Sequence, residues 1–164
     1  MVLLSVKAGM RAKEIACLTW AMATDAEGQI GDAIHLTNGA SKGKRGGRTI
    51  PLNTALREAL VSLKADRGEK AAPHRRAIYS ERGEGYSAAA VQVWFGRLYH
   101  KLGFTGASSH SGRRTFITQA ARKIIQCGGS LRDVQELAGH ASLATTQRYI
   151  QGDTEAKRKV VGLI

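Results

Sequence analysis

The chain has 164 residues, 43% of them hydrophobic, so it is long enough to form one domain with a core of its own. Its 25 Lys and Arg residues against 13 Asp and Glu leave a net charge of +12, a surplus typical of proteins that bind nucleic acid. Cys17 and Cys127 lie too far apart for a CxxC motif, so neither a disulfide framework nor a zinc site is indicated, and no apolar run suits a membrane span or secretory signal.

The first segment of the chain predicts two short helices. Apolar residues recur at helical spacing over residues 2–20, and Gly9 divides the segment. Arg11 begins the second helix, and Glu14 follows one turn later. Arg11 can therefore form an ordinary surface ion pair with Glu14, or it can reach a phosphate with its two-pronged guanidinium. The sequence leaves both interpretations open.

The next segment predicts a hairpin with a basic tip. Residues 33–37 and 48–53 have strand character, and a glycine-rich turn separates them. The spacing of the glycines in this turn does not fit a nucleotide-binding P-loop. The tip is expected to lie on a DNA backbone or in a minor groove, and it carries Lys42, Lys44, Arg45 and Arg48.

The middle of the chain predicts two longer helices. Asn53 can cap a helix that runs to about residue 65, and Ser87 can cap one that runs to about residue 102. The charged segment 65–76 contains Gly and Pro and is expected to be an exposed loop. Together these elements predict an α+β domain that is mainly α-helical, with a small antiparallel β-sheet near the N-terminal third.

Residues 108–149 predict three further helices with tight turns between them. Ser108 or Ser109 can cap the first, Ser130 the second and Ser142 the third. A helix-turn-helix DNA reader would have the same outline. That interpretation, however, gives no reason for the histidines and the tyrosine of this region.

Four residues of this region suggest phosphate chemistry. His110 and Arg113 lie one turn apart on one stripe of the first helix, near its N-terminus, where unpaired N–H groups and the helix dipole favour an anion. His140 follows a glycine, and Tyr149 lies nine residues beyond it, near the end of the third helix. Arginine and histidine can bind a phosphate that a tyrosine attacks.

Taken in order, these segments resemble the catalytic domain of the tyrosine recombinases, the phage integrase family, over essentially all 164 residues. GMRAKEIACLTW is similar to the family's first box, SKGKRGGRTIPL to its hairpin with the catalytic lysine, HSGRR to its His-x-x-Arg and LAGHASLATTQRYI to its final box. The resemblance implies a supporting role for Glu14. It implies that the catalytic residues are Arg11, Lys42, His110, Arg113, His140 and Tyr149.

The resemblance also implies what the protein does. A site-specific recombinase or integrase would break and rejoin DNA through a 3′-phosphotyrosyl intermediate, with no metal or other cofactor. Its partners would be double-stranded DNA with a specific recombination site and three further copies of the chain in a tetramer. Two alternatives remain, a catalytically incomplete DNA-binding fragment and a DNA-relaxing activity like that of type IB topoisomerases. DNA contacts are expected from Lys44, Arg45, Arg48 and Arg114.

The extent of the resemblance bears on domain organisation. The chain begins almost at the family's first box, so residues 1–164 are expected to form a single catalytic domain without the family's N-terminal DNA-binding domain. A cytoplasmic protein of bacterial or phage origin is expected. The tail, residues 153–164, is basic and then apolar, and it is expected to dock in cis or on a neighbouring subunit to bury Val160, Val161, Leu163 and Ile164.

Overall fold

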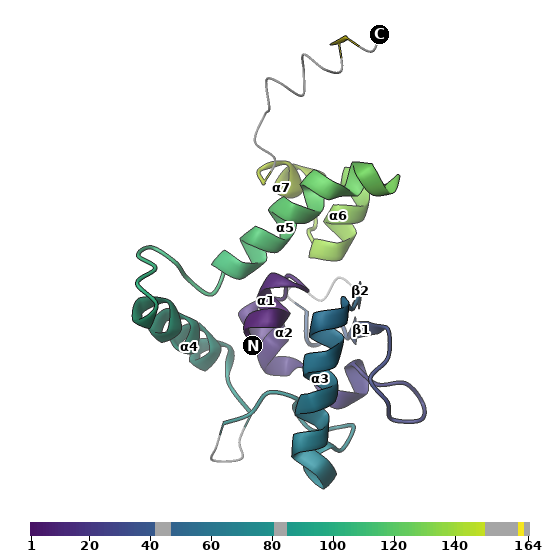
Figure 1. Cartoon of the computed structure of the whole chain (residues 1–164), viewed down its shortest axis with the longest axis vertical. Helices are drawn as coiled ribbons and strands as arrows, with labels where there is room; N and C mark the ends of the chain where they lie inside the picture. The colour runs from purple at the N-terminus through teal and green to yellow at the C-terminus, as the bar shows by residue number, and fades with distance from the viewer. Residues whose placement is uncertain (42–46, 81–84, 150–160, 163–164) are drawn as a thin grey trace.

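A computed structural model describes residues 1–41, 47–80, 85–149 and 161–162 (Figure 1). Lys42, Lys44 and Arg45 of the predicted hairpin tip lie outside these residues. The fold is mainly helical with one small antiparallel sheet, as the sequence predicts. In chain order the elements are α1 Val2–Val6, α2 Ala12–Cys17, η1 Trp20–Met22, β1 Ala33–Leu36, β2 Arg48–Pro51, α3 Thr54–Arg67, η2 Gly68–Ala71, α4 Ala88–Lys101, α5 Ser111–Lys123, η3 Ile124–Cys127, α6 Leu131–Ala138 and α7 Leu143–Gln147.

The larger of two hydrophobic cores lies among α1 to α4 and the sheet. Strands β1 and β2 pair so that Ile34 lies opposite Ile50, and both side chains are buried. A two-stranded ribbon is stable only when one face packs on other elements, and these isoleucines provide that face. Trp20 and Phe95 are the largest side chains of this core that are fully buried. Within the described ranges, no helix is both long and apolar enough to cross a bilayer.

The two predicted caps of the middle segment are confirmed. The side chain of Asn53 accepts a hydrogen bond from the N–H of Leu56 at 2.9 Å, and α3 begins at the next residue. The hydroxyl of Ser87 accepts one from the N–H of Ala90 at 3.1 Å at the start of α4. The charged segment that follows α3 is more regular than expected, because its residues 68–71 form the 3-10 helix η2.

The predicted caps of α5 are wrong. The N-cap residue is His110, whose own side chain makes no cap hydrogen bond. The hydroxyl of Ser108 instead accepts from the N–H of His110 at 3.3 Å, and the hydroxyl of Ser111 accepts from the N–H of Ser108 at 2.9 Å. The serine hydroxyls therefore stabilise the turn that precedes the helix. His110 is exposed, so the predicted buried stripe begins at Arg113.

Helices α5, α6 and α7 form a second group, which Figure 1 shows above α1, α2 and the sheet. This group has a small core of its own, made by Ile117, Val134 and Ala138. It meets the larger group where α5 packs on α1. The approach is close because Gly112 has no side chain: a Cβ there would lie 2.4 Å from Oγ of Ser5.

The last two helices occur in the predicted order, but the third predicted helix ends earlier than expected. Ser130 and Asp133 form the expected capping box at the start of α6. Helix α7 ends at Gln147, so Tyr149 lies in the turn beyond it and not on the helix. Of the apolar tail residues, Val161 is 72% exposed, and Val160, Leu163 and Ile164 lie outside the described ranges.

Candidate active site

The site is built around the C-terminal end of α6. The last carbonyls of a helix lack partners within the helix and carry the negative end of its dipole, so they attract cations. Here the carbonyl of Ala138 accepts hydrogen bonds from Arg48 and, at 2.6 Å, from Nη2 of Arg113. The next carbonyl, that of Gly139, accepts one from Nη2 of Arg11 at 2.9 Å. Three arginines from α5, β2 and the start of α2 therefore converge on two successive carbonyls.

A single buried carboxylate holds two of these arginines. Glu14 is completely buried, and its Oε1 lies 2.8 Å from Nη1 of Arg11 while its Oε2 lies 2.9 Å from Nη2 of Arg48. Oε2 also accepts the backbone N–H of Arg11 at 2.7 Å, which completes the capping box of α2. A buried carboxylate is stable only when its oxygens are paired in this way.

Arg113 is the most deeply placed of the three cations. It is 4% exposed, and its Nη1 donates to the carbonyl of Gly9 in addition to the bond on Ala138. Burial, and then repulsion by Arg11 and Arg48, lowers the pKa of Arg113 to about 9. The group remains charged at neutral pH. Three guanidiniums beside one carboxylate leave a surplus of two positive charges, which an anion would neutralise.

His140 and Tyr149 lie beside this cluster of cations. Nδ1 of His140 is 2.9 Å from Oγ1 of Thr146, and the backbone carbonyl of His140 accepts from Nε2 of Gln135 at 3.1 Å. The rings of His140 and Tyr149 stack, with centroids 5.6 Å apart and planes inclined by 20°. Tyr149 is half-buried against the small core of α5 and α6.

The charge state of His140 follows from its neighbours. Burial first, and then the positive charges of Arg113, Arg11 and Arg48, lower the pKa of His140 to about 4. The ring is therefore neutral at neutral pH and carries a single N–H. A neutral imidazole can donate one hydrogen bond to a phosphate oxygen without adding another full charge to the cluster.

This assignment predicts the titration of His140. We expect its ring to take up a second proton near pH 4, because the cations oppose a further positive charge. The unfolded chain, with the ordinary histidine pKa of 6.5, binds the proton first as the pH falls. The stability that neutral His140 contributes is therefore present above pH 6.5 and lost as the pH falls through 4. Ring C–H signals followed by NMR, assigned with a His140→Gln variant, measure the midpoint, and a midpoint near 6.5 would contradict the assignment.

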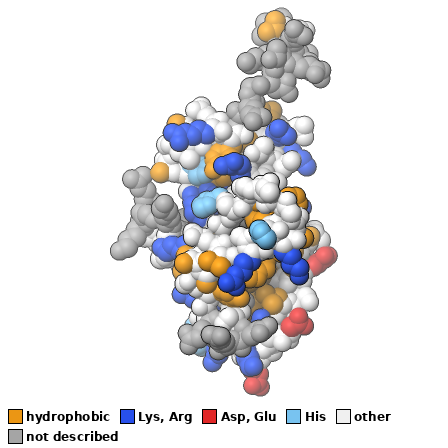
Figure 2. All heavy atoms as spheres, turned by 90° about the vertical axis from the view of Figure 1, so that its left-hand side faces the viewer, with side chains coloured by type: hydrophobic (Ala, Val, Ile, Leu, Met, Phe, Trp, Pro, Cys, Tyr) orange, Lys and Arg blue, Asp and Glu red, His pale blue; other side chains and the backbone are white. Residues whose placement is uncertain are grey.

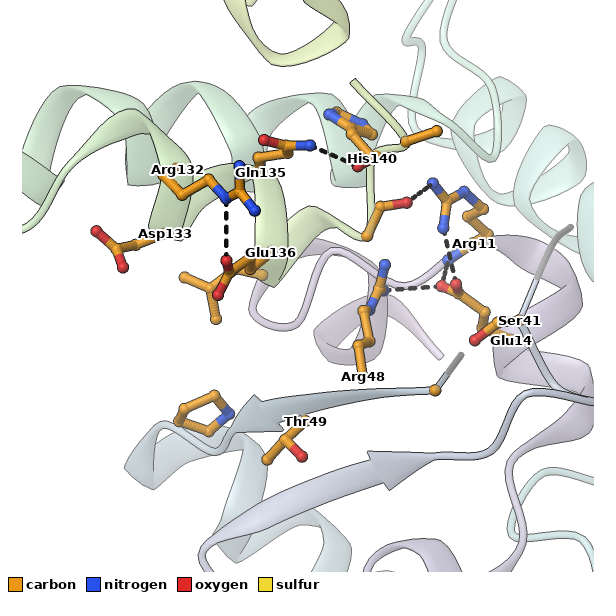
Figure 3. A pocket seen from close by; sticks show the side chains of 15 residues that line it. Arg11, Glu14, Ser41, Arg48, Thr49, Arg132, Asp133, Gln135, Glu136 and His140 are labelled. Carbon is orange, nitrogen blue, oxygen red and sulfur yellow. Dashed lines mark hydrogen bonds and ion pairs between the residues drawn. The ribbon is translucent and has the colours of Figure 1, made fainter. Parts of the chain in front are cut away.

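A cleft of about 850 Å³ opens beside the arginines, between α6 and β2 (Figure 3). Figure 3 shows Arg11 and Arg48 turned towards Glu14, with His140 at the end of α6. On the outer part of α6, Arg132 forms an exposed ion pair with Glu136 at 3.2 Å. Nowhere in the described ranges do three or more His, Cys, Asp or Glu residues gather closely enough to hold a metal ion.

The structure brings together Arg11, Glu14, Arg113, His140 and Tyr149, which come from three separate segments of the sequence. Arg11 does pair with Glu14, but Glu14 is buried, so the pair is not an ordinary surface one. A second nitrogen of Arg11 donates to the carbonyl of Gly139 at the end of α6, and its contact with a phosphate stays a prediction.

The other predicted site residues are exposed on α5, lie outside the described ranges, or are buried where an exposed side chain was expected. His110 is exposed at the N-cap of α5, and Arg114, the next residue after Arg113, is exposed on that helix. Lys42, Lys44 and Arg45 lie outside the described ranges. Arg48 was expected on the hairpin tip against DNA, but it is the first residue of β2 and its side chain is only 8% exposed. Its guanidinium faces Glu14 and Ala138 because the buried carboxylate needs a second cation.

Sequence reasoning missed two contributors to the site. One is the pair of carbonyls at the end of α6, and the other is the hydroxyl of Thr146. The glycine after α6 indicates an exposed helix end, but it does not indicate what binds there. Thr145 and Thr146 are equivalent in a sequence pattern, and only the packing of α7 distinguishes them.

Known proteins are similar to this chain over almost its whole length. The sequence model described as the Phage integrase family matches residues 1–156. "Tyrosine recombinase XerC" of Xanthomonas axonopodis pv. citri (strain 306) is 31% identical over 154 residues, which cover 93% of this chain and 46% of the relative. "Tyrosine recombinase XerD" of Bifidobacterium longum (strain NCC 2705) is 35% identical over 124 residues, which cover 70% of this chain and 39% of the relative. This chain therefore spans less than half the length of these relatives.

Solved structures share the fold at lower identity. The Tn1549 transposon integrase in complex with a circular intermediate DNA superposes with a TM-score of 0.73 and 20% identity, covering 99% of this chain and 57% of that one. The XerA recombinase superposes with a TM-score of 0.70 and 24% identity, covering 99% of this chain and 56% of that one.

Proposed function

Because this chain belongs to the phage integrase family, we propose that it is the part of a site-specific tyrosine recombinase that cuts and rejoins DNA. The observation that carries the proposal is the convergence of Arg11, Arg113, His140 and Tyr149 at the end of α6. Two cations with hydrogen-bond donors to spare, a neutral imidazole and a phenol meet the needs of a phosphate-transfer reaction.

The reaction is a transesterification at phosphorus. The phenol oxygen of Tyr149 attacks the phosphorus of a DNA phosphodiester and forms a new P–O bond, while the bond from phosphorus to the 5′-oxygen breaks. The products are a 3′-phosphotyrosyl link and a free 5′-hydroxyl. Because one phosphoester replaces another, the link retains the energy needed for rejoining when a 5′-hydroxyl attacks it, so neither ATP nor a metal enters the balance.

Charge supports the roles of the arginines. A phosphodiester carries one negative charge, and addition of a phenolate raises the charge of the reacting group to two. The cluster of three arginines and Glu14 has a surplus of two positive charges, so it matches the transition state better than the starting diester. Arg11 and Arg113 would bind the non-bridging oxygens, and His140 would donate a hydrogen bond to one of them.

Proton transfer is assigned to two further residues. Tyrosine has a pKa near 10 in water, so a neighbour must accept its proton at neutral pH. His110 is the proposed acceptor, with Arg113 one turn further along α5. Lys42 is the proposed donor to the leaving 5′-oxygen, as the resemblance of its hairpin implies.

The partners of the proposed reaction follow from its chemistry. Strand exchange joins two duplexes, each cut on both strands, so four copies of the active chain are needed.

Figure 2 shows Lys and Arg side chains spread over one face of the molecule, with acidic groups near its edge and lower end, which suits a DNA backbone. The Tn1549 integrase and a XerH recombinase were each solved bound to DNA, XerH to its difH substrate. We propose that this chain likewise acts on a specific double-stranded site, as a tetramer in the cytoplasm.

Covalent capture tests the proposed function without knowledge of the site. Duplexes with a randomised central sequence and a nick are incubated with the full chain, so that a cleaved end diffuses away and traps the enzyme. We expect SDS-resistant adducts that become enriched for one DNA sequence over repeated rounds and that form equally well in EDTA. Mass spectrometry of the digested adduct is expected to place the nucleotide on Tyr149.

A negative result has a defined meaning. The selection is repeated with the N-terminal portion of a XerC relative supplied in trans, since this chain spans less than half of that protein. DNA that is retained by the protein in both selections, yet never linked to it, would favour the non-cleaving DNA-binding fragment over the recombinase.

A further inference from the structure

Thr146 lies within the group formed by α6 and α7, with none of its surface exposed. It is three residues before Tyr149, and its Oγ1 lies 2.9 Å from Nδ1 of His140. The neighbouring Thr145 has a different partner, since its hydroxyl lies 3.1 Å from Oγ of Ser142. Thr146 therefore faces the histidine, while Thr145 faces the turn before α7.

Burial determines the direction of the hydrogen bond. Among the residues that the structure describes, the ring of His140 is the only hydrogen-bond partner of the Thr146 hydroxyl. If Nδ1 carried a hydrogen and donated it to Oγ1, the hydroxyl hydrogen would be buried without an acceptor. If the hydroxyl donates to Nδ1, both groups are satisfied. The second arrangement is favoured because an unsatisfied buried donor is costly.

We propose that Thr146 is a positioning residue that fixes the tautomer of His140, so that the neutral ring carries its hydrogen on Nε2. A neutral imidazole has one hydrogen to place, and the nitrogen that accepts a hydrogen bond leaves that hydrogen to the other. Nε2–H is then the ring's donor to a phosphate oxygen. The inference rests on the proposed function, in which His140 donates to the phosphate.

The other contacts of His140 do not determine this choice. Nε2 of Gln135 donates to the backbone carbonyl of His140 at 3.1 Å, and the stacked ring of Tyr149 restricts the tilt of the imidazole. A half-turn of the imidazole about the Cβ–Cγ bond would preserve both contacts, but it would exchange the position of Nδ1 with that of a carbon atom. Of the contacts that His140 makes with described residues, the bond to Thr146 is the one that distinguishes the two orientations. The hydroxyl therefore sets both the rotation and the protonation of the ring.

The tautomer is measured directly on the full chain. The two ring nitrogens of ¹⁵N-labelled His140 have separate chemical shifts, and the shift shows which nitrogen is protonated. At neutral pH we expect a protonated Nε2 and an unprotonated Nδ1 in the wild-type chain. In a Thr146→Val variant, which keeps the shape of the side chain and removes the hydroxyl, we expect a mixture of tautomers. A protonated Nδ1 in the wild-type chain would overturn the inference.

Three variants test the consequence for cleavage. The single-turnover rate of adduct formation on the selected nicked duplex is expected to fall about three- to ten-fold in Thr146→Val, the effect of one lost hydrogen bond. Thr146→Ser, which restores a hydroxyl, is expected to recover most of the rate and the wild-type tautomer. Thr145→Val, the matched control on the same helix, is expected to behave as the wild type.

The outcomes separate this inference from the proposed function. Unchanged cleavage in Thr146→Val despite a changed tautomer would overturn the positioning role. A reduced rate that Thr146→Ser does not restore would also overturn it, because the loss would then come from packing. If the wild-type chain forms no adduct, the proposed function fails, and the nitrogen shifts still decide the tautomer.

Discussion

Replacing Tyr149 by phenylalanine is expected to abolish the covalent adduct with DNA, with a loss of at least about 10³-fold in its rate of formation. The substitution removes only the hydroxyl that attacks phosphorus. Phenylalanine retains the stack on His140 and the packing against the small core of Ile117, Val134 and Ala138. The fold and the arginine cluster should therefore be unaffected, so the loss reports chemistry alone. The measurement is the yield of SDS-resistant adduct on the nicked duplex.

The chain offers a matched control for this substitution. Tyr99 on α4 is also half-buried and packs on the rings of Phe95 and Phe104. Tyr99→Phe is expected to form the adduct at the wild-type rate, and both variants are expected to bind the duplex as the wild type does. An adduct that persists in Tyr149→Phe would show that another residue is the nucleophile.

Replacing Glu14 by glutamine is expected to have the largest effect on stability. The variant keeps the size of the side chain but leaves Arg11, Arg48 and Arg113 without a counter-charge. Removing one partner from a buried ion pair costs about 3–5 kcal/mol. Because Arg11 is 23% exposed and partly screened by solvent, we expect about 3 kcal/mol of lost unfolding free energy. Denaturant unfolding measures the loss, which corresponds to a fall in Tm of roughly 10 °C for a chain of this size.

An exposed ion pair serves as the control for Glu14. Glu136 pairs with Arg132 one turn away on α6, and both side chains are mostly in solvent. Glu136→Gln is therefore expected to change the unfolding free energy by less than about 0.5 kcal/mol. Similar losses for the two variants would mean that burial does not strengthen the contribution of Glu14, contrary to the structure.

Local patterns predicted the elements because their causes are local. The caps at Asn53, Ser87 and Ser130 bond to groups at most three residues away, so a short stretch of sequence contains both partners of each hydrogen bond. The capping error at α5 arose where three serines compete over four positions, and the choice among them depends on the turn. The resemblance implied one site for six residues, and the structure brings Arg11, Arg113, His140 and Tyr149 together, whereas His110 is exposed and Lys42 lies outside the described ranges.

What the sequence did not reveal is how those residues are held. Arg113 binds the carbonyl of Gly9, 104 positions away, and Arg48 binds that of Ala138, 90 positions away. Every residue offers the same carbonyl, so no side-chain pattern marks these acceptors. Arg48 was interpreted as a DNA contact because its neighbours in the sequence are basic, whereas its position depends on a carboxylate that becomes buried only on folding.

The carbonyls of Ala138 and Gly139 have a consequence for how the protein tolerates mutation. A backbone carbonyl is present whatever side chain its residue carries, so a substitution at position 138 does not remove the acceptor itself, although a side chain larger than that of the fully buried Ala138 would have to displace the small core. Position 139 is different, because its backbone has φ +59° and a Cβ there would lie 2.6 Å from Nη1 of Arg48. Tolerance to mutation therefore differs between these two neighbouring positions: a side chain added at Gly139 would meet the guanidinium of Arg48 directly, whereas the carbonyl acceptors themselves do not depend on side-chain identity.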